Sequence, residues 1–327
     1  MWTRVLGYDL SRRHGRGLLG GCFWSQADFP RMVEAGLTGV VLSMATNPFR
    51  AASRQTPALL RNLARLRTAI EHHPDQLTLV ADHAGYRRAR EEGRLACFLA
   101  VQGANALASP AALDRVPTAL VSRITLLHLT ASSLGSPSAP SARRHRGLTA
   151  EGRAYVEALN ARRILVDLAH ISREGFWDAL AVQDGSQPPI VSHTGVRGVH
   201  DHWRNIDDDQ VRAIAERGGV IGIMFHSAFL GDRFWSGRAD AVVRHVEHVV
   251  KAGGEDVVAL GSDFDGLIVP PRDLRTIDRL PVLVQRMLDR GLTAEQVGKF
   301  LGGNYLRVVE AVRPGAGDAA GPPTPAS

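Results

Sequence analysis

Three histidines of this 327-residue chain stand directly after short apolar runs: His128, His170 and His193. Each run has the length and composition of a buried strand, so each imidazole falls where a strand should end. Because the carboxyl ends of parallel barrel strands lie on one face, we expect these side chains to meet there. Neutral imidazole is a common zinc ligand in hydrolytic sites, so the spacing favours a metal site.

Other polar side chains end apolar runs in the same way. Gln102 closes the run Leu95–Val101, and Asp263 and Asp265 follow the run Val257–Gly261. A carboxylate beside a metal ion can move protons while the metal polarises a carbonyl and supplies hydroxide near neutral pH. No Gly-x-Ser-x-Gly nucleophile turn competes with this chemistry. The pattern therefore predicts metal-assisted hydrolysis.

The remaining candidates are weaker. His83 and His226 also end apolar runs and could line the same face. His245 and His248 lie three residues apart in a predicted outer helix, which favours a solvated helix face. Cys97 lies inside a predicted strand, which favours a small core residue.

The elements that must position these residues alternate between strand and helix. The predicted strands are Thr38–Met44, Leu77–Ala81, Leu95–Val101, Ile124–Leu129, Ile164–Ala169, Pro189–Ser192, Val220–Phe225 and Val257–Gly261. The predicted helices are Pro57–Glu71, Leu148–Arg162, Asp207–Arg217, Arg238–Lys251 and Leu280–Arg290. This order predicts a parallel sheet with helices outside it, as an α/β fold of the (β/α)₈ TIM-barrel type. A doubly wound sheet is the alternative, but no Gly-x-Gly-x-x-Gly follows an early strand.

The domain organisation follows from the same pattern. Residues 1–312 are predicted to form one barrel, and residues 313–327, mostly Gly, Ala and Pro, a disordered tail. The stretch Ser132–Arg146 is long for a strand-to-helix connection and is expected above the carboxyl-terminal mouth.

Composition excludes several classes of protein. With 44% apolar and 22% charged residues the chain should be globular, and its two cysteines cannot form a disulfide framework. The net charge of +6 comes from scattered arginines, so we expect no nucleic-acid partner. No signal-peptide core and no run near ~18 apolar residues is present, which predicts a cytoplasmic protein without a membrane partner.

Five motifs together resemble the membrane (renal) dipeptidase family of zinc metallopeptidases. The resemblance runs from about Gly20 to Val312, and the order and spacing of the motifs make it specific. The motifs are Asp167-Leu168-Ala169-His170-Ile171-Ser172, Ser192-His193-Thr194-Gly195-Val196-Arg197, His202-Trp203-Arg204-Asn205, Gly261-Ser262-Asp263-Phe264-Asp265-Gly266 and Leu301-Gly302-Gly303-Asn304-Tyr305-Leu306-Arg307.

The resemblance implies a (β/α)₈ barrel that holds two zinc ions, hydrolyses unblocked dipeptides and forms a homodimer. It implies that His170 and His193 hold one zinc. It implies that His128 binds substrate and stabilises the tetrahedral oxyanion, and that Arg204 grips the substrate carboxylate. Asp263 matches the acid that carries the proton from metal-bound water to the leaving amine, whereas Asp265 is expected to be structural.

Two departures from the family pattern affect the metal site. The bridging glutamate of the family is replaced by Gln102, a neutral amide that bridges two dications poorly. The family's first strand carries His-x-Asp, two ligands of the other zinc, and Met1 begins after the place where that motif should lie. His73-Pro74-Asp75 fits His-x-Asp literally, but it precedes a strand and should lie on the wrong face.

These departures leave two explanations: a reading frame that begins too far downstream, which we favour, or a degenerate family member. Without the first strand, the barrel should have a gap that exposes two sheet edges. We predict a zinc-dependent dipeptidase-like hydrolase with one zinc at His170 and His193, with Gln102 or Asp263 nearby, and a weak or absent second zinc. Little or no turnover is expected from this exact chain. The alternatives are a homologue that binds a small carboxylated ligand or a partner without turnover, and a single-metal enzyme for another amide or a lactone.

Overall fold

The structure is a computed structural model. It describes residues 8–15, 17, 19–45, 47, 50, 52–107, 110–117, 119–144 and 146–315. Most of the predicted tail, residues 316–327, lies outside this described part, as does His145 of the predicted mouth loop.

A parallel sheet of eight strands forms the centre of the molecule, in the order β1-β3-β4-β5-β6-β7-β8 with β2 paired to β3. The strands are β1 (Gly39–Ala45), β2 (Leu77–Val80), β3 (Leu95–Gln102), β4 (Val121–Thr125), β5 (Leu165–Asp167), β6 (Ile190–Thr194), β7 (Val220–Ile223) and β8 (Val258–Leu260). One edge of β3 is shared, because Leu95–Phe98 pair with β2 and Leu99–Gln102 pair with β4. The curled parallel sheet confirms the predicted TIM-type barrel architecture.

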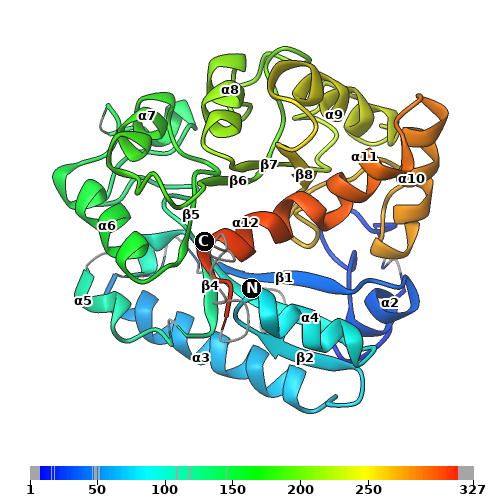
Figure 1. Ribbon diagram of the computed structural model, residues 1–327, viewed down its shortest axis with the longest axis horizontal. Helices are drawn as coiled ribbons and strands as arrows, with labels where there is room; N and C mark the ends of the chain where they lie inside the picture. Colours follow the sequence, from blue (N-terminus) through cyan, green and yellow to red (C-terminus); the bar gives the residue numbers. More distant parts are fainter. Residues whose placement is uncertain are drawn as a thin grey trace, which may run out of the picture.

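Helices surround this sheet, as Figure 1 shows. They are α2 (Phe29–Glu34), α3 (Ala52–Glu71), α4 (His83–Glu91), α5 (Pro110–Leu113), α6 (Ala150–Ala161), α7 (Arg173–Val182), α8 (Asp208–Glu216), α9 (Asp240–Gly253), α10 (Leu280–Asp289), α11 (Ala294–Gly298) and α12 (Asn304–Val312). Short helical turns add η1 (Ala104–Leu107), η2 (Pro140–Ala142), η3 (Ile277–Arg279) and η4 (Lys299–Gly303). The Thr149 side chain caps α6 by accepting a hydrogen bond from the Gly152 amide at 3.1 Å.

The sheet is open on one side. β1 and β8 are the two ends of the strand order, and in the residues that the structure describes no pairing joins them. A cavity of about 1390 Å³ lies there, lined by β1, by the end of β8 and by parts of α3, α10 and α12. The predicted gap with two exposed sheet edges is therefore present.

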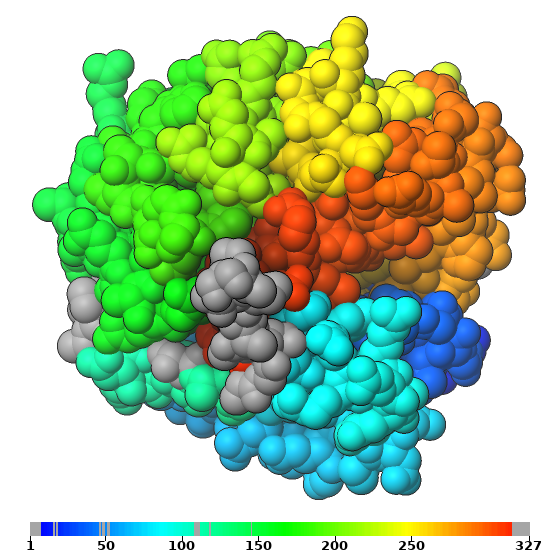
Figure 2. Space-filling model, in the orientation of Figure 1, coloured from blue at the N-terminus to red at the C-terminus, as the bar shows by residue number. Residues whose placement is uncertain are grey.

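The amino end of the barrel is covered by α12, which crosses the view in Figure 1. The Asn304 side-chain amide donates to the carbonyl oxygens of Glu255 and Val258, and Arg307 donates to Gly218 and Asp256. In Figure 2 this orange-red segment lies between the green and yellow atoms on one side and the cyan and blue atoms on the other. Asn304 and Arg307 of the motif at 301–307 thus hold α12 against the starts of β7 and β8, which is a structural role.

The first residues of the predicted tail contact the body of the protein. The backbone oxygens of Arg313 and Pro314 accept hydrogen bonds from the amides of His83 and Ala84 at the start of α4. The Arg313 guanidinium also donates to the carbonyl oxygen of Val121 at 3.3 Å. Residues 313 and 314 therefore belong structurally with the barrel.

Two sequence expectations are wrong. β4 begins at Val121 rather than Ile124 and ends at Thr125, because the buried polar side chain of Arg123 hides the strand from an apolar pattern. His245 is fully buried rather than solvated: its Nδ1 accepts from the Val196 amide at 2.9 Å, and its Nε2 contacts the Leu230 oxygen at 3.3 Å. The loop after β6 folds back over α9, which helical spacing alone does not show.

No helix in the part of the chain that the structure describes is long and apolar enough to span a membrane.

Candidate active site

The ends of three strands bring Gln102, His170 and His193 together. Gln102 is the last residue of β3, His193 lies in β6, and His170 follows β5. The Nε2 atoms of the two histidines are 2.9 Å apart, and the Gln102 side-chain nitrogen is 3.4 Å from each of them. The expected convergence of these residues is therefore present in the fold.

His128 borders the same cluster, with its ring centroid 4.7 Å from that of His170. Gly103, directly after Gln102, has φ +94, and a Cβ atom there would lie 3.0 Å from the Cβ of His128. Glycine is the residue that adopts this left-handed backbone without strain. Gly103 thus permits the close approach of the backbone that follows Gln102 to His128.

Burial keeps the three imidazoles neutral. It lowers the pKa of His128 to about 4, with a further contribution from the positive charge of Arg204. Burial, followed by the charge of Arg204, holds the pKa values of His170 and His193 well below their usual range. Neutral imidazole is the form that binds metal ions.

Asp263 follows β8 and lines the same cavity as Gln102 and His193. Burial raises the pKa of its carboxyl group to about 7, although the charges of Arg204 and Arg123 oppose this shift. A carboxyl group with a pKa near neutrality can both accept and return a proton. Asp263 therefore has the chemistry of a proton carrier.

Arg204 lies in the loop after β6 and is only 3% exposed. Its Nη2 donates to the backbone oxygen of His193 at 2.7 Å, while its Nε is buried without a partner in the described structure. Burial lowers the pKa of its guanidinium to about 10, and the group stays cationic at neutral pH. A buried cation with an unsatisfied donor suits a carboxylate ligand.

Several residues with left-handed backbone conformation lie in or next to the candidate site. Outside glycine, the described residues with positive φ are His170, Asp263, Asp265, Leu267, Phe23, Ser25 and Arg163. All except Arg163 lie in the turns after β5 and β8 or in the segment 23–25. Such backbone is costly and persists where surrounding contacts fix it.

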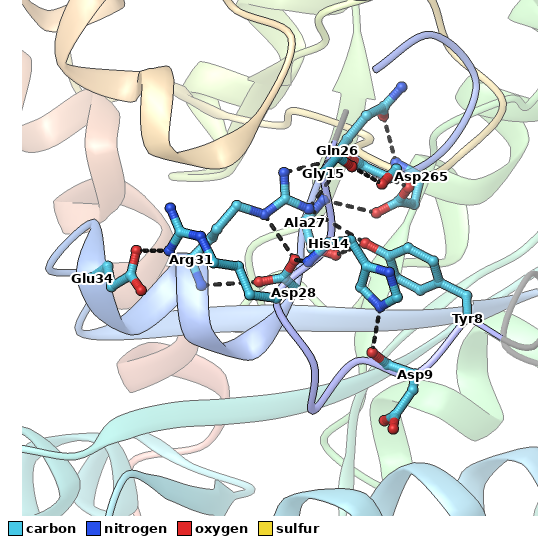
Figure 3. Close-up of polar contacts among 12 residues, drawn as sticks. Tyr8, Asp9, His14, Gly15, Gln26, Ala27, Asp28, Arg31, Glu34 and Asp265 are labelled. Atoms are coloured by element: carbon cyan, nitrogen blue, oxygen red, sulfur yellow. Dashed lines mark hydrogen bonds and ion pairs between the residues drawn. The ribbon is translucent and has the colours of Figure 1, made fainter. Parts of the chain in front are cut away.

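Asp265 supplies contacts of this kind, as Figure 3 shows. Its two carboxylate oxygens accept from the amides of Gln26 and Ala27 at 3.1 and 3.0 Å. In return its own amide donates to the Gln26 side-chain oxygen at 2.6 Å. Asp265 thus joins the N-terminal segment to the loop after β8, which is a structural role.

A buried ion pair extends this network. Arg31 Nε donates to Asp28 at 2.8 Å, and the Tyr8 hydroxyl donates to the Ala27 oxygen at 2.8 Å (Figure 3). Tyr8 and Asp9 also line the cavity that reaches His193 and Asp263. The N-terminal segment therefore forms one wall of the cavity that His193 and Asp263 also line.

Other sequence candidates lie elsewhere. His73-Pro74-Asp75 lies between the end of α3 and the start of β2, at the amino side of the strands. His83 contacts Glu310 of α12 at 3.6 Å, whereas His226 follows β7 and accepts from the Val269 amide at 3.1 Å. The predicted mouth loop does reach the site, because the Ser138 amide donates to the His170 oxygen at 2.6 Å.

Sequence reasoning missed two charged side chains inside the barrel. Asp167 is fully buried at the end of β5, and Arg123 on β4 lies 3.8 Å from it and lines the cavity. The charge of Arg123 acts on His193 and on Asp263, and the charge of Asp167 acts on Arg204. Arg123 directly precedes the predicted strand Ile124–Leu129, whose start was placed too late, whereas Asp167 lies inside the predicted strand Ile164–Ala169 as an acid in an otherwise apolar run.

The donor set fits one metal ion. His170 and His193 offer two neutral imidazole nitrogens at one point. The nitrogen of the Gln102 amide faces them, and a turn of this amide would offer its oxygen as a third ligand. Within the described ranges, no three His, Cys, Asp or Glu residues come together as a metal-binding group. The described residues do not fit a pair of ions bridged by a carboxylate.

The fold and the site define a class: a TIM-type barrel with a hydrolase-like centre at the carboxyl end of its strands. The sequence profile of the membrane dipeptidase family (peptidase family M19) matches residues 22–320. The chain belongs to the membrane dipeptidase family, which makes it a metallodipeptidase-like hydrolase.

Individual relatives agree with this assignment. An uncharacterized protein in the pqqA 5′ region of Klebsiella pneumoniae is 32% identical over 264 residues, which is 78% of this chain and 96% of the relative. Dipeptidase verJ of Clonostachys rogersoniana is 29% identical over 311 residues, covering 95% of this chain and 77% of the relative.

Solved structures show the same fold. The crystal structure of the dipeptidase AC, a metallopeptidase of family M19, has a TM-score of 0.80 and 25% identity, covering 89% of this chain and 90% of that one. A metallopeptidase of Rhodobacter sphaeroides, bound to a phosphinate mimic of L-Ala-D-Ala, has a TM-score of 0.80 and 24% identity, covering 88% and 90%.

Proposed function

We propose that this chain hydrolyses the peptide bond of unblocked dipeptides with one zinc ion held by His170 and His193. The observation that carries the proposal is the approach of their two Nε2 atoms to 2.9 Å beside Gln102. Zinc bound at such a site acts as a Lewis acid on the scissile carbonyl and makes water more acidic. No second ion is needed for this assignment.

The side chains around the metal position would divide the remaining work. Asp263 accepts a proton from the attacking water and passes it to the leaving amine, for which its near-neutral pKa is suited. Arg204 binds the substrate carboxylate through its unpaired Nε. His128, as neutral imidazole, donates a hydrogen bond to the developing oxyanion.

The neutral Gln102 limits this activity. An amide ligand leaves the charge of the metal uncompensated and holds a second ion poorly, so we expect slow turnover. The same observation favours a second candidate function, a homologue that binds a small carboxylated ligand or a partner without turnover. A cytoplasmic location, a homodimer and a single domain over residues 1–312 remain predictions.

Metal analysis combined with a dipeptide assay tests the proposal. We expect one tightly held zinc per chain and slow hydrolysis of dipeptides, and we expect His170→Ala to lose this hydrolysis. After a chelator removes the metal, added zinc should restore hydrolysis in the unaltered protein but not in His170→Ala. A zinc-loaded protein that binds dipeptides without cleaving them would favour the second candidate. Two tightly held zinc ions per chain would contradict the single-metal assignment.

A further inference from the structure

The Asp167 carboxylate lies at the carboxyl end of β5, among the candidate site residues. It is completely buried and accepts four hydrogen bonds. The hydroxyl groups of Thr125 and Ser192 donate to Oδ2 at 2.5 and 2.6 Å. The amides of Ala169 and Ser192 donate to Oδ1 at 3.1 and 2.9 Å. These four donors use the acceptor positions of an ionised carboxylate.

Ser192 stands between this carboxylate and a candidate metal ligand. Its Oγ lies 2.6 Å from Asp167 Oδ2 and 2.8 Å from His193 Nδ1. A serine hydroxyl has a single proton, and the carboxylate can only accept it. Since that proton is used by Asp167, the contact with His193 is a hydrogen bond only if Nδ1 carries a proton and donates to Ser192.

We propose that Asp167 and Ser192 are positioning residues that fix His193 as the Nδ1–H tautomer, with Nε2 left as a lone pair facing His170. Asp167 holds Ser192 at two points, because its carboxylate accepts from the Ser192 backbone amide at 2.9 Å as well as from the hydroxyl group. Arg123, 3.8 Å from Asp167, offsets the buried negative charge. Nothing in this arrangement requires a bound metal, so the tautomer is set in advance.

The consequence for metal binding rests on the proposed function. A metal-binding histidine needs its free nitrogen unprotonated, and a fixed partner at the other nitrogen removes the cost of selecting that tautomer. Loss of such a partner typically weakens metal affinity by about 10–100-fold. The same loss should let the imidazole of metal-free His193 sample both tautomers.

Nuclear magnetic resonance of the ¹⁵N-histidine-labelled, metal-free full chain tests the tautomer directly. Long-range ¹H–¹⁵N correlations distinguish Nδ1–H from Nε2–H in each imidazole, and we expect Nδ1–H for His193 near pH 7.5. A wild-type His193 in the Nε2–H form would overturn the proposal, whether or not any variant folds.

Three variants then test the role of the hydroxyl group. Ser192→Ala should mix the His193 tautomers and weaken zinc affinity by about 10–100-fold in a chelator competition. Ser192→Thr, which keeps the hydroxyl, should restore both. The matched control is Ser122→Ala, which removes a buried strand hydroxyl that donates to the Leu99 oxygen at 3.1 Å and should change neither.

The outcomes separate this inference from the proposed function. Unchanged tautomer and affinity in Ser192→Ala, or equal losses in Ser122→Ala, would show that Ser192 has no special positioning role. If the expected shifts occur but no dipeptide is cleaved by any form, the positioning role stands and the proposed hydrolysis fails.

Discussion

The Nη2 atom of Arg204 donates a hydrogen bond to the backbone oxygen of His193, 2.7 Å away. One strand end therefore carries a candidate metal ligand and also anchors the candidate carboxylate-binding cation. The Nε of Arg204 is left buried without a partner in the described structure, so the donor that a substrate carboxylate would use has a fixed place beside the metal position. Because Nη2 and Nε have separate partners, a substitution that keeps one positive charge should impair recognition of the substrate carboxylate.

Arg204→Lys should weaken the use of free-acid dipeptides. A lysine ammonium cannot both hold the His193 oxygen and present a second planar donor. Hydrogen bonds to charged groups contribute about 1.5–3 kcal/mol, which corresponds to a fall in kcat/KM of roughly 10–100-fold. Steady-state assays with a free-acid dipeptide measure this loss.

The control substrate is the same dipeptide with an amidated carboxyl end. It should be a poor ligand of the unaltered protein, and Arg204→Lys should change its binding little. Equal binding of free-acid and amidated dipeptides by the unaltered protein would refute the role of Arg204.

Gln102→Glu should strengthen metal binding. The Gln102 side-chain nitrogen lies 3.4 Å from both candidate imidazole ligands, so a glutamate there would place a negative charge next to the bound cation. We expect zinc affinity and dipeptide turnover to rise by at least about tenfold, and occupancy of a second ion to rise with them. Zinc titration and hydrolysis assays on the same preparation measure both.

Gln102→Met is the matched variant for this experiment, because it keeps the volume and removes the amide. It should bind zinc more weakly than the unaltered protein. If glutamate and methionine have the same effect, the amide only satisfies a local hydrogen bond and is no metal ligand.

Asp263→Asn should remove the proton carrier while keeping the shape of the site. An asparagine cannot accept the proton of water, and general acid–base groups typically contribute about 10²–10⁴-fold to a rate. We expect kcat to fall by that amount with KM changed less than about threefold, since Arg204 and the imidazoles remain. A proportional loss of zinc from the variant would instead place Asp263 among the metal ligands.

Strand ends were the part of the site that could be predicted from the sequence. Gln102, His170, His193 and Asp263 each follow an apolar run, and parallel strands bring such ends to one face. Arg123 could not be found this way. It is a buried cation inside β4, where its partner Asp167 is contributed by the next strand of the sheet.

His245 shows the limit of periodicity in a helix. Its position on α9 is compatible with either an exposed or a covered face, and the choice depends on the loop after β6. That loop is brought to α9 by tertiary packing, because its Val196 amide needs a buried acceptor. Local sequence carries no information on such a contact.

The burial of His245 leads to the last prediction, a pH dependence of stability. Burial lowers the pKa of His245 to about 4; the hydrogen bond with the Leu230 oxygen opposes this shift, whereas the nearby charge of Arg244 adds to it. In the unfolded chain the same imidazole titrates near its ordinary value of about 6.5. Between these pH values the unfolded state binds a proton that the folded state does not. The contribution of His245 to the free energy of unfolding is therefore fully present above about pH 6.5 and is lost as the pH falls toward 4.

His245→Gln should reduce this acid sensitivity. The glutamine amide can accept from Val196 and donate to Leu230, so we expect a cost of about 1–3 kcal/mol at pH 7.5 and a smaller slope below pH 6.5. The slope of unfolding free energy against pH should fall by up to about 1.4 kcal/mol per pH unit.

His248→Gln is the control, since His248 lies one turn further along α9, half-buried and 2.7 Å from Asp208. Urea titrations of the metal-free proteins at several pH values measure the slopes, and equal slopes for His245→Gln and the unaltered chain would show that His245 does not control the acid sensitivity.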